Sequence, residues 1–197
     1  MNGPESLGGP VLWQGEALYQ IRMGETGSYR HRFGGPLDLV LEDFPGDQKP
    51  LHRVATLDLT DPRLGASIPQ VRLLPLLYGF TFSGCALRYQ ILSDTAVRVL
   101  DLAPLRSSED WPYRGYPEFF VPVPFDLEAG ALTDLDKLDA LTWQGLEGTA
   151  SQDLIVIIPP SAEYGVSLWG EGDSELVEVM FQIDTKTGHV LAVNQCG

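Results

Sequence analysis

Apolar and polar residues alternate along most of this chain, and the alternation predicts β-strands. In residues 17–23 the odd positions are apolar, whereas Gln20 and Arg22 lie on the opposite side. A period of two residues is typical of a strand that buries one face. The same alternation, or a short apolar run, predicts further strands at residues 29–33, 37–41, 53–59, 71–78, 85–91, 96–102, 154–158, 166–169, 176–183 and 189–193.

Glycines and prolines between these segments predict how the strands are arranged. Residues 24–27 read as a hairpin loop between the first two strands, and residues 184–188 as the loop of a C-terminal hairpin. Pro75 has no N–H to donate, so its strand is expected at a sheet edge or a bulge. Residues 154–158 have no polar side and therefore predict a central strand that is buried on both faces.

One segment, residues 131–144, has a helical pattern. Its leucines recur every three residues, and polar residues fill the other side. Asp134 and Asp136 would lie near the favourable end of the helix dipole, and Gly145 would end the helix. We therefore expect an α+β fold, mostly antiparallel β-sheet with one clear amphipathic helix. The leucines of this segment are Leu132, Leu135, Leu138 and Leu141.

The chain is expected to form a single α+β domain over residues 1–197, with a subdomain change near 103–130 as the alternative. Within that region, residues 111–125 hold six aromatic residues and four prolines. Proline excludes a helix interior and a central strand, so a stiff crossover packed between two parts of the sheet is favoured over an exposed binding lip. The rings expected at the surface are Trp111, Tyr113 and Tyr116, and those expected in the core are Phe119, Phe120 and Phe125.

Composition and charge narrow the classes of partner. The 197 residues are 44% hydrophobic and 20% charged, as in a folded globular domain. The net charge of −14 is concentrated in residues 101–197, where four basic and seventeen acidic residues leave −13. Such a field attracts a basic protein and repels nucleic acid and anionic membranes. No apolar run approaches the roughly 20 residues of a membrane helix, and the start lacks a signal-peptide pattern, so a cytoplasmic location is expected.

The residues that could carry chemistry form no recognisable motif. The three histidines lack metal-ligand spacing, and neither a nucleophile elbow nor a phosphate-binding loop occurs, so no catalytic residue, metal or cofactor is expected. His31 alternates with aromatic neighbours and is expected to be a packed, hydrogen-bonded strand residue. Cys85 is expected to be a buried structural thiol, and its pairing with Cys196 stays open. The oligomeric state also stays open.

Three classes of function remain. The favoured one is a non-catalytic protein-interaction domain whose acidic C-terminal half binds a basic partner, with an immunity or toxin-neutralising role as its sharpest form. A small-ligand or carbohydrate-binding module would stack its ligand on rings of residues 111–125. An enzyme with an unrecognised site would use Ser83, Cys85 or paired acids. The candidate contact residues are Trp111, Tyr113, Tyr116, Trp169, Glu171, Asp173 and Glu175.

Residues 33–80 carry motifs in an order that is found in a known family. Phe33-Gly-Gly-Pro36 is followed by the strand-like segment Lys49–Leu59 and then by the apolar segment Leu73–Tyr78. This succession resembles the YwqG-like family of uncharacterised bacterial cytoplasmic proteins. The resemblance implies a β-rich α+β fold and no settled activity, and it transfers no site residue to this chain.

Overall fold

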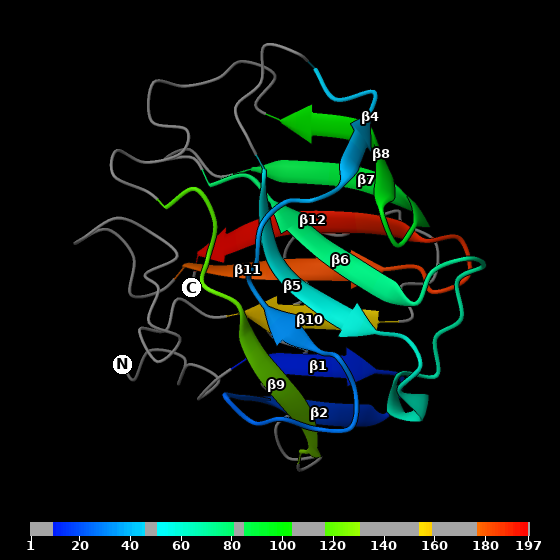
Figure 1. Cartoon of the computed structure of the whole chain (residues 1–197), viewed down its shortest axis with the longest axis vertical. Coiled ribbons are helices and arrows are strands. Elements are labelled where there is room, and N and C mark those ends of the chain that lie inside the picture. The colour runs from blue at the N-terminus through cyan, green and yellow to red at the C-terminus, as the bar shows by residue number, and fades with distance from the viewer. Residues whose placement is uncertain are drawn as a thin grey trace.

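The computed structural model describes residues 10–45, 51–80, 85–103, 117–130, 154–158 and 177–196. These residues form twelve β-strands and one 3-10 turn, η1 (Pro62–Leu64) (Figure 1). Among them, no helix is long and apolar enough to cross a membrane. The strands are β1 (Val11–Gln14), β2 (Ala17–Met23), β3 (Arg32–Phe33), β4 (Val40–Glu42), β5 (His52–Asp58), β6 (Leu73–Tyr78), β7 (Ala86–Ser93), β8 (Ala96–Ala103), β9 (Val123–Ala129), β10 (Leu154–Ile158), β11 (Val177–Ile183) and β12 (His189–Cys196).

The strands belong to one sheet in the order β4-β8-β7-β12-β11-β10-β1-β2-β9-β3-β5-β6. Neighbours are antiparallel except β4 and β8, which run parallel. The sheet changes direction at β9, because residues 125–129 pair with β2 and residues 123–124 pair with β3. Beyond β9, strands β5 and β6 cross in front of β10, β11 and β12 (Figure 1), and β6 contacts β12 and β7. The sheet therefore packs against itself.

The α+β class predicted from the sequence is wrong. The described residues contain no helix of seven residues or more, and η1 is their one helical turn. The amphipathic helix predicted at residues 131–144 lies outside the described residues. In an α+β fold a helix covers the sheet, whereas here β5 and β6 cover it, so strands supply both layers of the core. The described part of the chain is a β fold.

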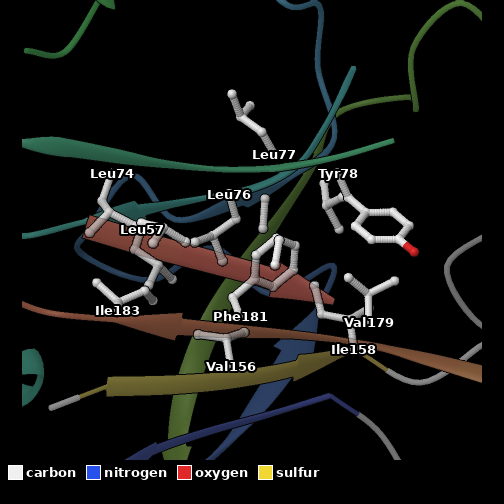
Figure 2. Close-up of a cluster of buried hydrophobic side chains, with 14 of the residues drawn as sticks. Leu57, Leu74, Leu76, Leu77, Tyr78, Val156, Ile158, Val179, Phe181 and Ile183 are labelled. Carbon is white, nitrogen blue, oxygen red and sulfur yellow. The ribbon is translucent and has the colours of Figure 1, made fainter. Parts of the chain in front are cut away.

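The main core lies between the two layers of the folded sheet (Figure 2). Leu57 of β5 and Leu76 of β6 face Phe181 of β11, and all three side chains are fully buried. Burying each such side chain contributes about 1.5–3 kcal/mol. Strand alternation sends Leu74 and Leu76 into this core, while Leu77 points to the other side of β6 (Figure 2). Strands therefore supply both sides of this core.

The free edge of β6 is closed by a tyrosine from across the core. The hydroxyl of Tyr89 on β7 donates to the carbonyl of Pro75 at 2.9 Å and accepts the N–H of Leu77 at 3.0 Å. Because β6 has a paired neighbour only in β5, these backbone groups have no ladder partner on their outer side. The placement of Pro75 in an edge strand, expected from its missing N–H, is confirmed.

Several strand predictions are confirmed. β2 has the predicted bounds, and β11 and β12 form the predicted C-terminal hairpin around residues 184–188. β10 lies between β1 and β11 with every side chain buried, as its lack of a polar side indicated. Its second face joins a smaller apolar cluster on the opposite side of the sheet. The buried members of that cluster are Val11, Leu18, Ile155, Ile157 and Met180.

Two expectations about strand pairing are wrong. β2 and β3 do not form a hairpin across residues 24–27, because β9 lies between them. Pro124 was expected outside any central strand, yet it lies in β9 between β2 and β3. The proline is tolerated because β2 ends at Met23. Beyond that end, the N–H of Gly24 donates to the carbonyl of Pro124 at 2.8 Å. This bond uses the carbonyl of the proline and does not need the N–H that proline lacks.

Other differences concern the bounds of strands. The strand predicted at 29–33 is shortened to β3, and the one predicted at 37–41 begins later, as β4. β1 and β9 were not predicted, and the strand predicted at 166–169 lies outside the described residues. A single domain, with a subdomain change near 103–130 as the alternative, stays a prediction.

Candidate functional site

The seven contact residues predicted from the sequence lie outside the described residues, and their role stays a prediction. They are Trp111, Tyr113, Tyr116, Trp169, Glu171, Asp173 and Glu175. The described remainder of the aromatic segment begins at residue 117. Residues 117–122, which we call the lip, form an exposed stretch interrupted by one buried ring.

Phe120 is the buried ring of the lip, and its two neighbours face solvent. Phe120 is 1% exposed, whereas Phe119 is 42% and Val121 is 69% exposed. The prediction that Phe119 lies in the core is therefore wrong, and the same prediction for Phe120 and Phe125 is confirmed. Of the three consecutive apolar residues 119–121, Phe120 alone is buried in the core.

Aromatic packing fixes Phe120 from three sides. Its ring centroid lies 5.4 Å from each of Phe33, Phe80 and His52. His52 also holds the start of the lip, since its Nε2–H donates to the carbonyl of Pro117 at 2.8 Å. Burial lowers the pKa of His52, while the bond to Pro117 acts weakly in the opposite direction. The ring is therefore neutral at pH 7 and suits the apolar site.

A two-glycine turn presses against the back of the lip. The N–H of Gly35 donates to the carbonyl of Phe120 at 2.8 Å. Gly34 has a φ of +67°, and a Cβ at this position would lie 2.7 Å from the carbonyl oxygen of Phe120. Only glycine fits both the backbone conformation and this close approach. The turn and the Phe120 contacts together hold the lip in one position.

A buried acid–histidine pair is the feature that most resembles a catalytic site. Nε2 of His31 lies 2.9 Å from the carboxylate of Asp61, and both side chains are fully buried. The N–H of Asp58 donates to Nδ1 of His31 at 3.0 Å, so Nε2 carries the proton and donates to Asp61. A general base needs a free ring nitrogen that can reach substrate. Both ring nitrogens are used here, which confirms the prediction of a packed, hydrogen-bonded histidine.

Arg63 links this pair to β9. Its guanidinium contacts Asp61 at 2.7 Å and Asp126 at 2.6 Å, and it donates to the carbonyl of Leu127 at 2.6 Å. Burial raises the pKa of Asp61, but hydrogen bonds from Arg63 and His31 outweigh it and leave the pKa below its usual value. The hydrogen bond from Arg63 likewise lowers the pKa of Asp126. These charges serve to attach η1 to the sheet.

Cys85 is buried, as predicted, and its thiol is free. Burial raises its pKa to about 12, so the thiol stays protonated at neutral pH and is a poor nucleophile. Its N–H bonds to the hydroxyl of Tyr78 at 2.9 Å and to the side chain of Asn194 at 3.2 Å. The second possible nucleophile, Ser83, lies outside the described residues.

The described residues line a small apolar cavity and gather no cluster of metal ligands. An apolar cavity of about 10 Å³ between β2, β5, β9 and β10 has room for about one water molecule. No group of three His, Cys, Asp or Glu side chains in the described ranges is arranged to hold a metal ion. The lip, which exposes Phe119 and Val121 on either side of a buried ring, is the candidate functional surface of the described part.

The fold and this surface define a class: a β-sheet protein with an exposed apolar lip and buried polar groups that are engaged in structural contacts. Comparison with known proteins gives no narrower assignment, because the chain matches no family model, no curated protein and no solved structure. The resemblance of residues 33–80 to the YwqG-like family stays a prediction.

Proposed function

We propose that this chain is a non-catalytic protein-interaction domain that binds a basic partner through its acidic C-terminal half. The observation that carries the proposal is the charge balance. The chain has 27 acidic and 13 basic residues, so 27 − 13 = 14 carboxylates remain even if every base pairs with one acid. A surplus of this size accelerates association with a cationic protein and rejects anionic partners.

The ion pairs of the described residues support this reading. Five arginines already contact carboxylates within the chain, and Arg63 and Arg98 contact two each. Because these five arginines are paired within the chain, none of them offsets the excess of carboxylates elsewhere. The remaining arginines in these pairs are Arg22, Arg30 and Arg53.

An immunity or toxin-neutralising role in the cytoplasm is the sharpest form of the proposal. A protein that neutralises a cationic toxin needs fast, charge-steered binding and no chemistry of its own. The free thiol of Cys85 agrees with a reducing compartment. Two described groups that could act as a base or a nucleophile, His31 and Cys85, are occupied or inert, which argues against catalysis by these two residues.

The alternative of a carbohydrate-binding module loses one of its proposed stacking rings. Phe120, one of its stacking rings, is covered by Phe33, Phe80 and His52 and offers no face to a ligand. An enzyme that uses Cys85 is disfavoured by the protonated thiol.

The test uses a fluorescein-labelled decalysine peptide, with a decaglutamate peptide as control. We expect measurable binding of decalysine at about 20 mM NaCl that weakens at least tenfold at about 300 mM NaCl, because salt screens exposed charges. Binding that ignores salt, or equal binding of both peptides, overturns the proposal. Fluorescence anisotropy provides the affinities.

A matched pair of variants localises the effect. Glu171→Gln with Glu175→Gln removes two negative charges from the acidic half, whereas Glu16→Gln with Glu25→Gln removes two exposed charges from the near-neutral half. We expect only the first pair to weaken decalysine binding. Equal losses would show that net charge alone attracts the peptide and that the acidic half is no specific site.

A further inference from the structure

The lip is the densest exposed apolar feature of the described residues. These residues expose four large hydrophobic side chains, and two of them, Phe119 and Val121, are separated by only Phe120. The other two are isolated: Val40 lies on β4 and Leu100 at a bulge in β8. Adjacent exposed apolar side chains on a folded protein mark a contact surface more often than scattered ones do.

The lip is also preorganised for binding. The ring of Phe120 is held among three other rings. His52 bonds to the carbonyl of Pro117, and Gly35 bonds to the carbonyl of Phe120. Gly34 has no side chain and so permits the close approach of its turn to Phe120. A preordered segment loses little conformational entropy when it docks, so its contact energy is retained as affinity. Phe119 can thus act as a fixed aromatic anchor of the kind that dominates binding energies.

The charge of the lip itself, and of the half of the sequence that contains it, indicates the kind of partner. The lip carries one charged residue, the exposed Glu118 beside Phe119, and it lies in the half of the chain with a net charge of −13. A second copy of this chain would bring another −14 to the contact and be repelled. A protein with lysines or arginines around an apolar recess would match both the exposed apolar side chains, Phe119 and Val121, and the negative charge.

We infer that Phe119 and Val121 insert into an apolar recess, rimmed by basic side chains, on the partner. The inference rests on the proposed function and adds the contact point to it. In this arrangement the acidic half speeds the encounter, whereas the two apolar side chains slow the dissociation.

Two labelled peptides of equal charge test the inference: Lys-Leu-Lys-Leu-Lys and Lys-Ser-Lys-Ser-Lys. We expect the leucine peptide to bind about tenfold more tightly, since leucine supplies apolar contact that serine lacks. Phe119→Ser with Val121→Ser should remove this advantage and leave the binding of the serine peptide unchanged. Val40→Ser with Leu100→Ser, the matched exposed control, should preserve the advantage. Thermal unfolding of each variant verifies that it is folded.

The outcomes separate this inference from the proposed function. If the serine peptide binds with the expected salt dependence but leucine adds nothing, the inference fails and the proposed function stands. An equal loss in the lip variant and the control variant also overturns the inference. If neither peptide and no decalysine binds, the proposed function fails, and this inference fails with it. Self-association of the wild type that the lip variant abolishes in sedimentation would identify a second copy as the occupant and overturn the choice of a basic partner.

Discussion

Removing one hydroxyl tests whether Tyr89 holds the two layers of the sheet together. In Tyr89→Phe the ring stays in its fully buried site, but the N–H of Leu77 and the carbonyl of Pro75 lose their shared partner. Because Tyr89 is fully buried, its loss leaves the two backbone groups without this partner inside the core. The perturbation is small in volume and confined to one atom, which makes its energy interpretable.

The magnitude follows from the cost of leaving buried polar groups without a partner. That cost is about 1–3 kcal/mol per group, and it is partly offset because the hydroxyl no longer has to be desolvated. We expect the free energy of unfolding to fall by about 2–3 kcal/mol. For a chain of this size, the melting temperature should fall by roughly 4–12 °C.

Urea unfolding followed by circular dichroism measures the loss, and amide hydrogen exchange at Leu77 measures its location. The control is Tyr19→Phe, because Tyr19 packs partly buried against the same core and its hydroxyl has no hydrogen-bond partner among the described residues. We expect the control to lose less than about 0.5 kcal/mol. Equal losses in both variants, or unchanged exchange at Leu77, would refute the role assigned to Tyr89.

Two further predictions concern the support of the lip. Gly34→Ala should cost more than about 2 kcal/mol, because the strain of a positive φ adds to the clash with Phe120. Gly15→Ala, with a φ of +56° and open space around it, should cost only about 1 kcal/mol; equal melting temperatures of the two variants would contradict the steric argument. His52 has a lowered pKa, so the unfolded chain binds more protons than the folded one just below pH 6.5, and stability should fall as the pH drops from about 6.5 towards 5. His52→Phe should remove that part of the pH dependence in urea midpoints, and an unchanged profile would assign it to another group.

The local pattern of apolar and polar side chains was sufficient to predict the bounds of some strands. β2 alternates and β10 is uniformly apolar, and both have the predicted bounds. Pairing across about 100 residues leaves no such signal, so the insertion of β9 between β2 and β3 could not be predicted. The fold class failed for a related reason. The leucine pattern in residues 131–144 was the basis of the α+β prediction. In the described residues, β5 and β6 form the layer that covers the sheet, and the sequence predicted them only as strands.

The sequence predicted the importance of the segment that contains the lip, but not which of its side chains are buried. Its aromatic and proline content singled out the segment. Which residue turns inward depends on Phe33, His52 and Phe80, and these meet only in the folded sheet. Composition alone therefore placed Phe119 in the core, where it is not.

The position of the lip follows from the way the sheet closes. Pro124 lies where β9 stops pairing with β2 and starts pairing with β3, and the lip is the chain that leads directly into this point. Phe120 and Pro124 are therefore required by the fold. Phe120 fills the core, and Pro124 lies where the pairing between β9 and β2 ends. Phe119 and Val121 contribute little to that packing and are exposed on a backbone that the fold itself holds fixed. Substitutions of Phe119 and Val121 should therefore change the exposed surface of the lip without altering the sheet beneath it.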